Sequence, residues 1–185
     1  SLMDLTSLKK EPVTLMLRHS EAEVVGCHPL FGPAVTNPAG HNIVLCRGRG
    51  VARYLWIKKI FEETGYTVLE RNPAEHDRMM AIVQALNHLN TVTLGLAIAS
   101  FDAPLAEVNL FATPVFKIKM DLIRKVFTEN PGLYADIIAG NPEMDGVLQT
   151  YEKTVHDVRR LVSPGKADSL KDAISAAAEK LFRSG

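Results

Sequence analysis

The chain has 185 residues, of which 46% are hydrophobic, and its 21 Lys and Arg balance 21 Asp and Glu at a net charge of zero. This length and apolar content allow one large domain, or part of a domain with a smaller one, around a buried core. The balanced charge gives no field that would attract nucleic acid or an anionic membrane, so we expect neither partner.

The two cysteines, Cys27 and Cys46, lie in apolar, strand-like stretches without a CxxC motif. This predicts reduced, buried thiols in a cytoplasmic protein. Together with His28 and His41 they would supply four zinc ligands, but their spacings match no common zinc finger or ribbon. We therefore expect no metal site.

The most apolar stretch, residues 79–98, is interrupted by Gln84, Asn87, His88 and Asn90. Because of these polar side chains we expect no membrane span. No signal-peptide pattern precedes Asp4.

Residues 1–72 alternate short strands and helices. Apolar runs predict strands over 23–28, 42–46 and 66–70, and helical spacing predicts helices over 12–18 and 51–64. This pattern is typical of part of an α/β sheet domain that would pack against strands not present in the sequence.

Beyond residue 72 the pattern changes to long helices only, which makes the fold class α+β and mainly α. Helices are predicted over 74–100, 114–128, 131–139, 142–161 and 169–183. The last four each begin at a proline or a serine that suits a first turn.

The predicted helix over 74–100 is apolar almost all round, so we expect it to be buried. Gln84, His88 and Thr91 interrupt it at i, i+4 and i+7 and fall on one face, where they need hydrogen-bond partners. An internal structural network and a ligand site are equally good explanations of these residues alone.

His28 ends a predicted strand and is followed by Pro29, which we expect to stop the strand pairing. The imidazole would then lie at a sheet edge, where sites form in open α/β sheets. Taken alone, a histidine there is more often structural. Cys27 is not its partner, since adjacent strand residues point to opposite faces.

Ser7 and Lys9 share one side of the chain if that segment is extended. A turn serine and a solvated lysine are the commoner roles of these residue types. The Gly48-Arg49-Gly50 turn imitates a dinucleotide-binding fingerprint, but Arg53 stands where a small residue must let the helix approach the strand. We therefore reject it as a phosphate site.

Three motifs carry a more specific signal: residues 4–10 (DLTSLKK), 26–33 (GCHPLFGP) and 75–88 (EHDRMMAIVQALNH). In this order and at these separations they resemble the prephenate dehydrogenase family, which makes the precursor of tyrosine. Matches at Pro114 and at residues 131–138 (PGLYADII) keep the same register, so the resemblance runs nearly end to end.

The resemblance implies the C-terminal remnant of a Rossmann-like α/β sheet in residues 1–72, followed by an all-helical dimerisation domain in residues 73–185 of a homodimer. Family members open with a Gly-rich nucleotide-binding half, and this sequence begins after it. We therefore expect the chain alone to be inactive and to bind neither NAD nor NADP measurably.

The implied activity of an intact enzyme is the oxidative decarboxylation of prephenate to 4-hydroxyphenylpyruvate, with hydride passing to NAD or NADP. The choice of cofactor stays open, because the family reads the ribose in the half that precedes this sequence. Tyrosine is an implied inhibitor. An arogenate dehydrogenase and a non-catalytic helical dimerisation or regulatory module are the alternatives.

The resemblance also assigns site residues. His28 is implied to be the catalytic histidine, and Ser7 to lie beside the nicotinamide and the substrate hydroxyl. His88 and Gln84 are implied to face the substrate, and Lys9 is expected to join them.

One position departs from the family pattern, which has an arginine that pairs with a substrate carboxylate. The alignment puts Lys125 there, with Arg124 beside it. Lysine keeps the charge but loses the bidentate fork. Either Lys125 acts as a point charge, or a rotated helix lets Arg124 replace it, or both are solvated surface cations.

Overall fold

The computed structural model describes residues 1–32 and 35–183. The chain divides into two compact units, Ser1–Met144 and Asp145–Gly185. The domain boundary predicted at residue 72 is a different division and stays a prediction. Pro33, the last residue of the second motif, lies outside the described residues.

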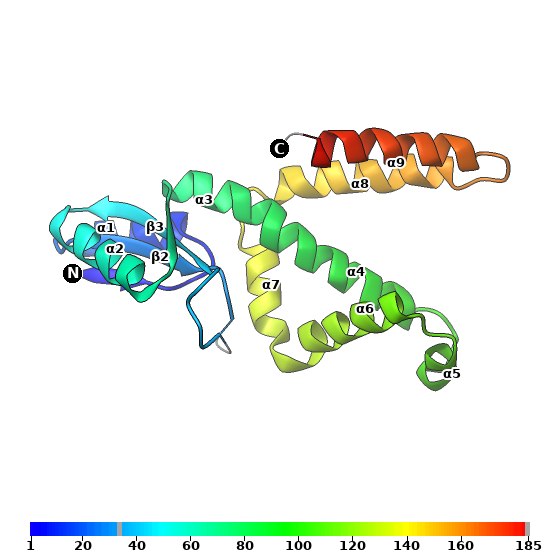
Figure 1. Ribbon diagram of the computed structural model, residues 1–185, viewed down its shortest axis with the longest axis horizontal. Coiled ribbons are helices and arrows are strands. Elements are labelled where there is room, and N and C mark those ends of the chain that lie inside the picture. The colour runs from blue at the N-terminus through cyan, green and yellow to red at the C-terminus, as the bar shows by residue number, and fades with distance from the viewer. Residues whose placement is uncertain (33–34, 184–185) are drawn as a thin grey trace. The chain divides into compact units, whose positions relative to one another are not determined.

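The first unit contains a four-stranded sheet with the order β1-β2-β3-β4 (Figure 1). The strands are β1 (Leu2–Asp4), β2 (Val24–Pro29), β3 (Asn42–Arg49) and β4 (Thr67–Glu70). β1 and β2 are parallel, as are β3 and β4, whereas β2 and β3 are antiparallel. A helix links the two strands of each parallel pair, as a parallel crossover requires.

Helices α1 (Lys10–His19) and α2 (Ala52–Thr64) pack on the sheet. The core beneath α2 consists of buried residues from β2, β3 and the helix itself, namely Val25, Cys27, Ile43, Leu45, Tyr54 and Ile57. Since strand residues alternate between faces, Gly26 and His28 lie on the opposite face. There a Cβ on Gly26 would come within 2.7 Å of Val13 on α1, so the glycine lets α1 approach the strand closely.

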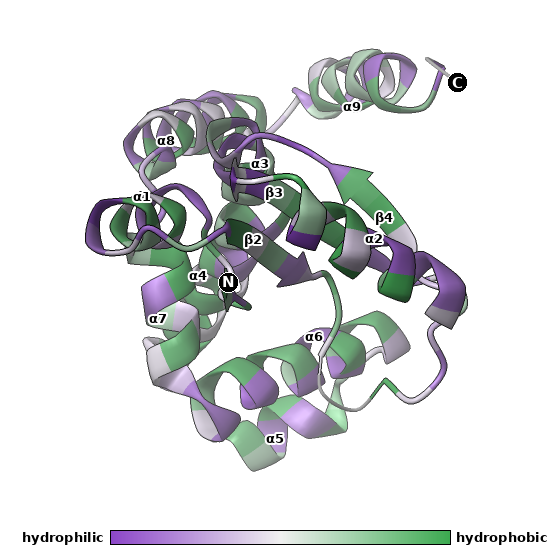
Figure 2. Cartoon of the chain, turned by 90° about the vertical axis from the view of Figure 1, so that its left-hand side faces the viewer, coloured by the Kyte–Doolittle hydropathy of each residue, from purple (hydrophilic) through white to green (hydrophobic). Residues whose placement is uncertain are grey.

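Strand β2 is largely hydrophobic and becomes hydrophilic at its C-terminal end (Figure 2). The expectation that Pro29 stops the pairing is wrong on the β3 side, because Pro29 lies opposite Ile43 and the next N–H, of Leu30, donates to Asn42. On the other side, β1 pairs only as far as Gly26. The end of β2 is therefore an edge on that side, and His28 stands at it.

In the Gly48-Arg49-Gly50 turn, which imitates a dinucleotide fingerprint, a side chain of the protein already binds the backbone N–H groups. The carboxylate of Glu23 accepts the N–H of Val51 at 3.1 Å and that of Arg53 at 3.0 Å, at the N-terminus of α2. A Cβ on Gly50 would also collide with Glu23. The donors that would hold a phosphate are thus already used.

The helix predicted over 74–100 is confirmed as one continuous element (Figure 1), but it contains a π-helical turn. It consists of α3 (Pro73–Met80), the π turn η1 (Ala81–Leu86) and α4 (Asn87–Ala99). Asn72 and Glu75 form a capping box at its start, which satisfies the first free N–H groups.

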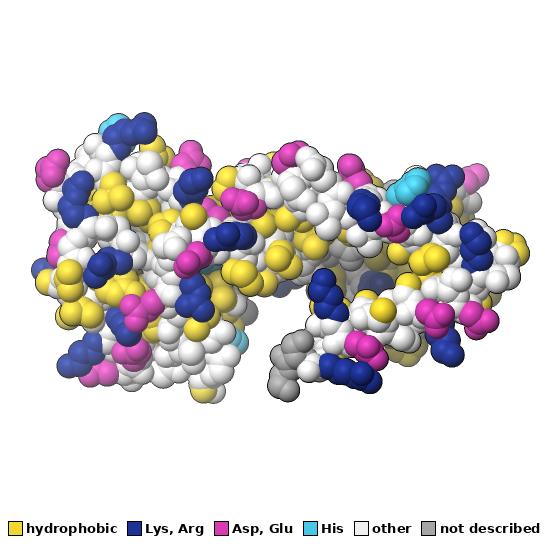
Figure 3. Space-filling view, turned by 90° about the horizontal axis from the view of Figure 1, so that it is seen from above, with side chains coloured by type: hydrophobic (Ala, Val, Ile, Leu, Met, Phe, Trp, Pro, Cys, Tyr) yellow, Lys and Arg dark blue, Asp and Glu magenta, His cyan; other side chains and the backbone are white. Residues whose placement is uncertain are grey.

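The expectation that this helix is buried is wrong for the single chain. Met79, Ile82, Val83 and Leu96 are each more than half exposed, because the other elements cover only part of its surface. Hydrophobic side chains also reach the surface among charges of both signs in the space-filling view (Figure 3).

The same segment, Pro73–Ala99, is long and apolar enough to cross a membrane by length and composition alone. The four polar side chains therefore do not exclude a span on those criteria, contrary to expectation. One helix of this kind is weak evidence, since core helices of soluble proteins meet the same test.

Further helical elements follow the long helix in the described part of the first unit. They are α5 (Leu105–Leu110), which was not predicted, α6 (Pro114–Arg124) with the π turn η2 (Lys125–Glu129), and α7 (Pro131–Ala139). The side chains of Thr113 and Asn130 cap α6 and α7, and a proline occupies the first turn of each.

Apart from the first residue of α8, the second unit holds α8 (Met144–Leu161) and α9 (Ala167–Phe182), joined by a turn in which Gly165 adopts a φ of +80°. No residue of α9 is buried. With a small sheet followed by helices, the predicted fold class is confirmed.

Candidate active site

Three buried side chains form a hydrogen-bonded series that starts near the C-terminal end of β2. Nδ1 of His28 lies 2.9 Å from Nε2 of His76 on α3, and Nδ1 of His76 lies 2.7 Å from Oδ1 of Asp77. The exposed fractions of His28, His76 and Asp77 are 4%, 2% and 1%. Two histidines and a carboxylate are therefore hydrogen-bonded in series, away from solvent.

Asp77 is held by the first turn of α1. Its Oδ1 accepts the N–H of Lys9 at 2.8 Å and its Oδ2 accepts that of Lys10 at 2.9 Å. Burial raises the pKa of Asp77, but hydrogen bonds from His76 and from these two backbone groups outweigh it and hold the pKa below its ordinary value. Asp77 is therefore ionised and can only accept hydrogen bonds.

The hydrogen positions follow from this network. Because Asp77 only accepts, Nδ1 of His76 carries a hydrogen, and His76 in its neutral form offers Nε2 as an acceptor. Nδ1 of His28 then donates to His76, which leaves Nε2 of His28 without a hydrogen. That nitrogen faces Nε2 of Gln84 at 3.5 Å.

The environment also keeps His28 neutral. Burial, followed by the neighbouring His76 and the charge of Lys9, lowers the pKa of His28 from 6.5 to about 4. A neutral imidazole with a free ring nitrogen can accept a proton at neutral pH. His28 is thus suited to act as a general base.

Gln84 lies in the π turn η1, and its side-chain amide is directed toward His28. Its Oε1 is buried without a hydrogen-bond partner among residues 1–32 and 35–183. Buried polar atoms are normally paired, so an unpaired oxygen beside a free ring nitrogen indicates a place for a polar ligand group. π turns are frequent at functional sites.

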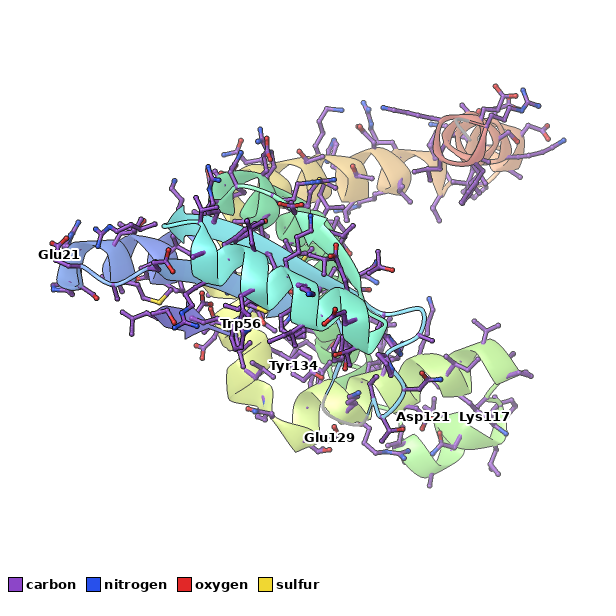
Figure 4. All side chains as sticks on the ribbon, turned by 60° about the vertical axis from the view of Figure 1, so that its left-hand side comes forward. Glu21, Trp56, Lys117, Asp121, Glu129 and Tyr134 are labelled. Atoms are coloured by element: carbon purple, nitrogen blue, oxygen red, sulfur yellow. The ribbon has the colours of Figure 1, made fainter. Side chains whose placement is uncertain are left out.

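His88 follows one turn after Gln84 and is half-buried. Its ring meets the edge of Tyr134 on α7 at a centroid distance of 4.8 Å (Figure 4 labels Tyr134). Burial lowers the pKa of His88. His88 is therefore neutral at neutral pH and is fixed by an aromatic neighbour.

The assumption of an extended segment at Ser7 and Lys9 is wrong, since Ser7 lies in a bend and Lys9 caps α1. Ser7 lines a cavity of about 400 Å³ together with residues of α7 that include Leu133. Lys9 is fully buried, where its ammonium contacts Asp4, so it is not a solvated lysine. A substrate role for Ser7 and Lys9 stays a prediction.

Arg124 and Lys125 are exposed on the surface of α6 and η2. Arg124 forms an exposed ion pair with Asp121 at 3.5 Å, on the helix where Figure 4 labels Asp121. Among the described residues, no hydrogen bond or ion pair joins either cation to His28 or Gln84. Their assignment to a substrate carboxylate therefore stays a prediction.

His76 and Asp77 received no role from the sequence, although both belong to the third motif. The available signal was a histidine next to an acid in the first turns of a predicted helix. In the part of the chain that the structure describes, no group of three or more His, Cys, Asp or Glu could hold a metal ion.

The lowered pKa of His28 predicts a pH dependence of stability. His28 takes up a proton near pH 6.5 in the unfolded chain but only near pH 4 in the folded chain. Protonation therefore favours the unfolded chain increasingly as the pH falls from 6.5 toward 4. Between pH 7 and 5 the free energy of unfolding should fall by about 2 kcal/mol through His28.

Urea unfolding followed by the fluorescence of Trp56 would measure this loss. The His28→Asn variant should lose correspondingly less stability over the same range, while the His88 contribution remains in both proteins. Parallel stability curves for the variant and the parent chain would contradict the assignment.

Comparison with known proteins identifies relatives of this chain. The family model described as "Prephenate dehydrogenase, dimerization domain" matches residues 72–176. The T-protein of Haemophilus influenzae is 34% identical over 153 residues, which cover 83% of this chain and 41% of the relative. A "Probable arogenate/prephenate dehydrogenase" of Methanocaldococcus jannaschii is 29% identical and covers 87% of this chain and 37% of the relative.

Solved structures give the same fold. Prephenate dehydrogenase from A. aeolicus, in complex with hydroxyphenyl propionate and NAD+, superposes with a TM-score of 0.79 at 22% identity, covering 97% of this chain and 65% of that one. Synechocystis arogenate dehydrogenase superposes with a TM-score of 0.74 at 18% identity, covering 96% and 67%. The chain spans roughly two fifths of the length of these curated relatives, and it belongs to the prephenate dehydrogenase family.

Proposed function

We propose that these residues form the base-catalytic and helical part of a dehydrogenase that oxidatively decarboxylates prephenate to 4-hydroxyphenylpyruvate. The observation that carries the proposal is a neutral, buried His28 whose Nε2 contacts only the amide of Gln84 among the described residues, beside the unpaired oxygen of that amide. The names of the relatives support the substrate class, and that of a Schizosaccharomyces pombe relative includes NADP(+).

His28 accepts the proton of the substrate's ring hydroxyl at Nε2 as the carbon–oxygen bond gains carbonyl character. The proton returns to the same oxygen after the ring carboxylate has left as carbon dioxide and the ring is aromatic. Gln84 donates its N–H to the hydroxyl oxygen in place of its 3.5 Å contact with His28. Both contacts strengthen as charge develops, which is what lowers a barrier.

A nicotinamide cofactor, NAD or NADP, supplies the acceptor for the hydride, and Ser7 is the residue of this chain that we assign beside it. The turn after β3 does not fit the pyrophosphate, because Glu23 already accepts the N–H groups at the start of α2. We therefore assign the 185 residues no complete dinucleotide site and expect no dehydrogenase activity from them alone.

Replacing the base tests the proposal. In the active dehydrogenase, His28→Asn should lower kcat by at least about 100-fold and leave KM nearly unchanged, because the hydrogen bond to His28 strengthens only in the transition state. Steady-state kinetics with prephenate would measure both constants. His19→Asn, which changes an exposed histidine at the end of α1, is the control. A His28 variant with most of its turnover would remove this residue from the mechanism.

The substrate carboxylate gives a second test. Lys125→Ala should raise KM by roughly tenfold or more if Lys125 pairs with it, since a hydrogen bond between charged groups contributes about 1.5 to 3 kcal/mol. Arg124→Ala should then have almost no effect. The reverse result would assign the role to Arg124, and two silent variants would contradict both assignments.

We also propose that the chain forms a homodimer through the long helix. Four of its large apolar side chains are more than half exposed in the single chain, and an exposed apolar surface of this kind typically covers an interface. The description of the matched family as a dimerization domain supports the same assignment. We expect a total interface of more than about 2,000 Å².

A matched pair of leucines tests the dimer. Leu96→Lys on the long helix should yield a monomer by light scattering at micromolar concentration, because a buried charge at an interface is unfavourable. Leu55→Lys on α2 should leave the dimer intact, although Leu55 is similarly exposed, at 54% compared with 58%. A parent chain that is monomeric at this concentration would contradict the proposal.

A further inference from the structure

We propose that His76 and Asp77 are positioning residues that determine which nitrogen of His28 carries the hydrogen, and so hold Nε2 as the proton acceptor. The catalytic meaning of this inference rests on the proposed function. The arrangement of hydrogens itself is a property of the chain without substrate.

The two carboxylate oxygens of Asp77 accept the N–H groups of Lys9, Lys10 and His76. An acceptor that is already fixed by two backbone donors cannot turn or become a donor. The opposite tautomer of His76 would direct a ring lone pair at Oδ1 of Asp77 across 2.7 Å. In a buried site that repulsion has no water to relieve it.

The hydrogen bond to Asp77 determines which nitrogen of His76 donates, and this in turn determines which nitrogen of His28 donates. With its one hydrogen on Nδ1, a neutral His76 accepts at Nε2, so the nitrogen of His28 that lies 2.9 Å away donates. The ring centroids are 5.1 Å apart at an angle of 70°, an edge-on contact that also fixes the plane of His28. Orientation and hydrogen position are therefore determined together.

This control matters because an isolated neutral histidine prefers its hydrogen on Nε2, the nitrogen that the proposed reaction needs free. Which ring nitrogen is protonated depends on the hydrogen bond that the other nitrogen makes. The Gln84 amide would adapt to either form, since it has both a donor and an acceptor. Only the side of His28 that faces His76 can therefore impose the choice.

Nitrogen NMR of the complete chain at pH 7.5 tests the inference directly, using the long-range couplings between ring carbons and nitrogens. His28 and His76 should each show a protonated Nδ1 and an unprotonated Nε2, with the His28 signals identified by their loss in His28→Asn. A parent chain in which His28 carries its hydrogen on Nε2 would overturn the proposal without any variant.

The His76→Phe variant removes the acceptor while keeping a ring of similar size. His28 should then shift mainly to the form with hydrogen on Nε2, and in the active dehydrogenase kcat should fall at least tenfold. Asn141→Ala is the matched control, because Asn141 is buried and donates to the backbone oxygen of Asp77 at 2.9 Å but does not touch either ring. It should leave the His28 tautomer unchanged.

The outcomes separate this inference from the proposed function. An unchanged tautomer in His76→Phe, or an equal change in Asn141→Ala, would show that His76 and Asp77 do not position His28. An absence of prephenate oxidation by the complete dehydrogenase would contradict the proposed function. In that case the NMR result would still decide the arrangement of hydrogens.

Discussion

The carboxylate of Asp77 is the contact on which the arrangement of the candidate site depends. It lies near the start of the long helix and accepts the N–H groups that begin α1, so it joins the helical part of the chain to the sheet. The same group fixes His76, which in turn fixes His28 at the end of β2. One buried negative charge thus aligns two secondary structure elements and a chain of hydrogens.

The residues around this contact explain why a charge can be buried there. Three donors satisfy the carboxylate, which offsets the cost of removing it from water. Gly26 allows α1 to approach β2 closely enough to bring those donors into place. Gly26 and His28 of the second motif therefore act on the same face of β2. The glycine lets α1 approach this face, and the side chain of His28 projects from it.

Much of the fold was predictable from local signals. Apolar runs located β2, β3 and β4 but not the short β1, and prolines with their capping residues located α6 and α7, because these features depend on neighbouring residues. Burial of the long helix was predicted wrongly, since periodicity reports that a surface is apolar but not what covers it. The π turns escaped detection because side-chain pattern does not reveal a change in backbone hydrogen bonding.

The candidate site was predictable only in part, because local sequence patterns do not reveal contacts between distant residues. His28 and Gln84 were identified, and the structure brings their side chains together. The contact between His28 and His76 joins residues 48 positions apart, and no local pattern encodes such a pair. Lys9 was assigned to the substrate, with a solvated lysine as the commoner alternative, yet its ammonium has a carboxylate neighbour inside the protein.

The π turn between His76 and His88 has a consequence for how this segment can vary. A π turn accommodates an additional residue relative to α-helical winding. Loss of a single residue from Ala81–Leu86 would therefore restore regular winding and leave the helix after it in nearly its present orientation. In a regular α-helix the same loss would rotate everything that follows by about 100°. The contact of His88 with Tyr134 would thus survive a shortening of the π turn, whereas a deletion in α3 would turn His88 away from it.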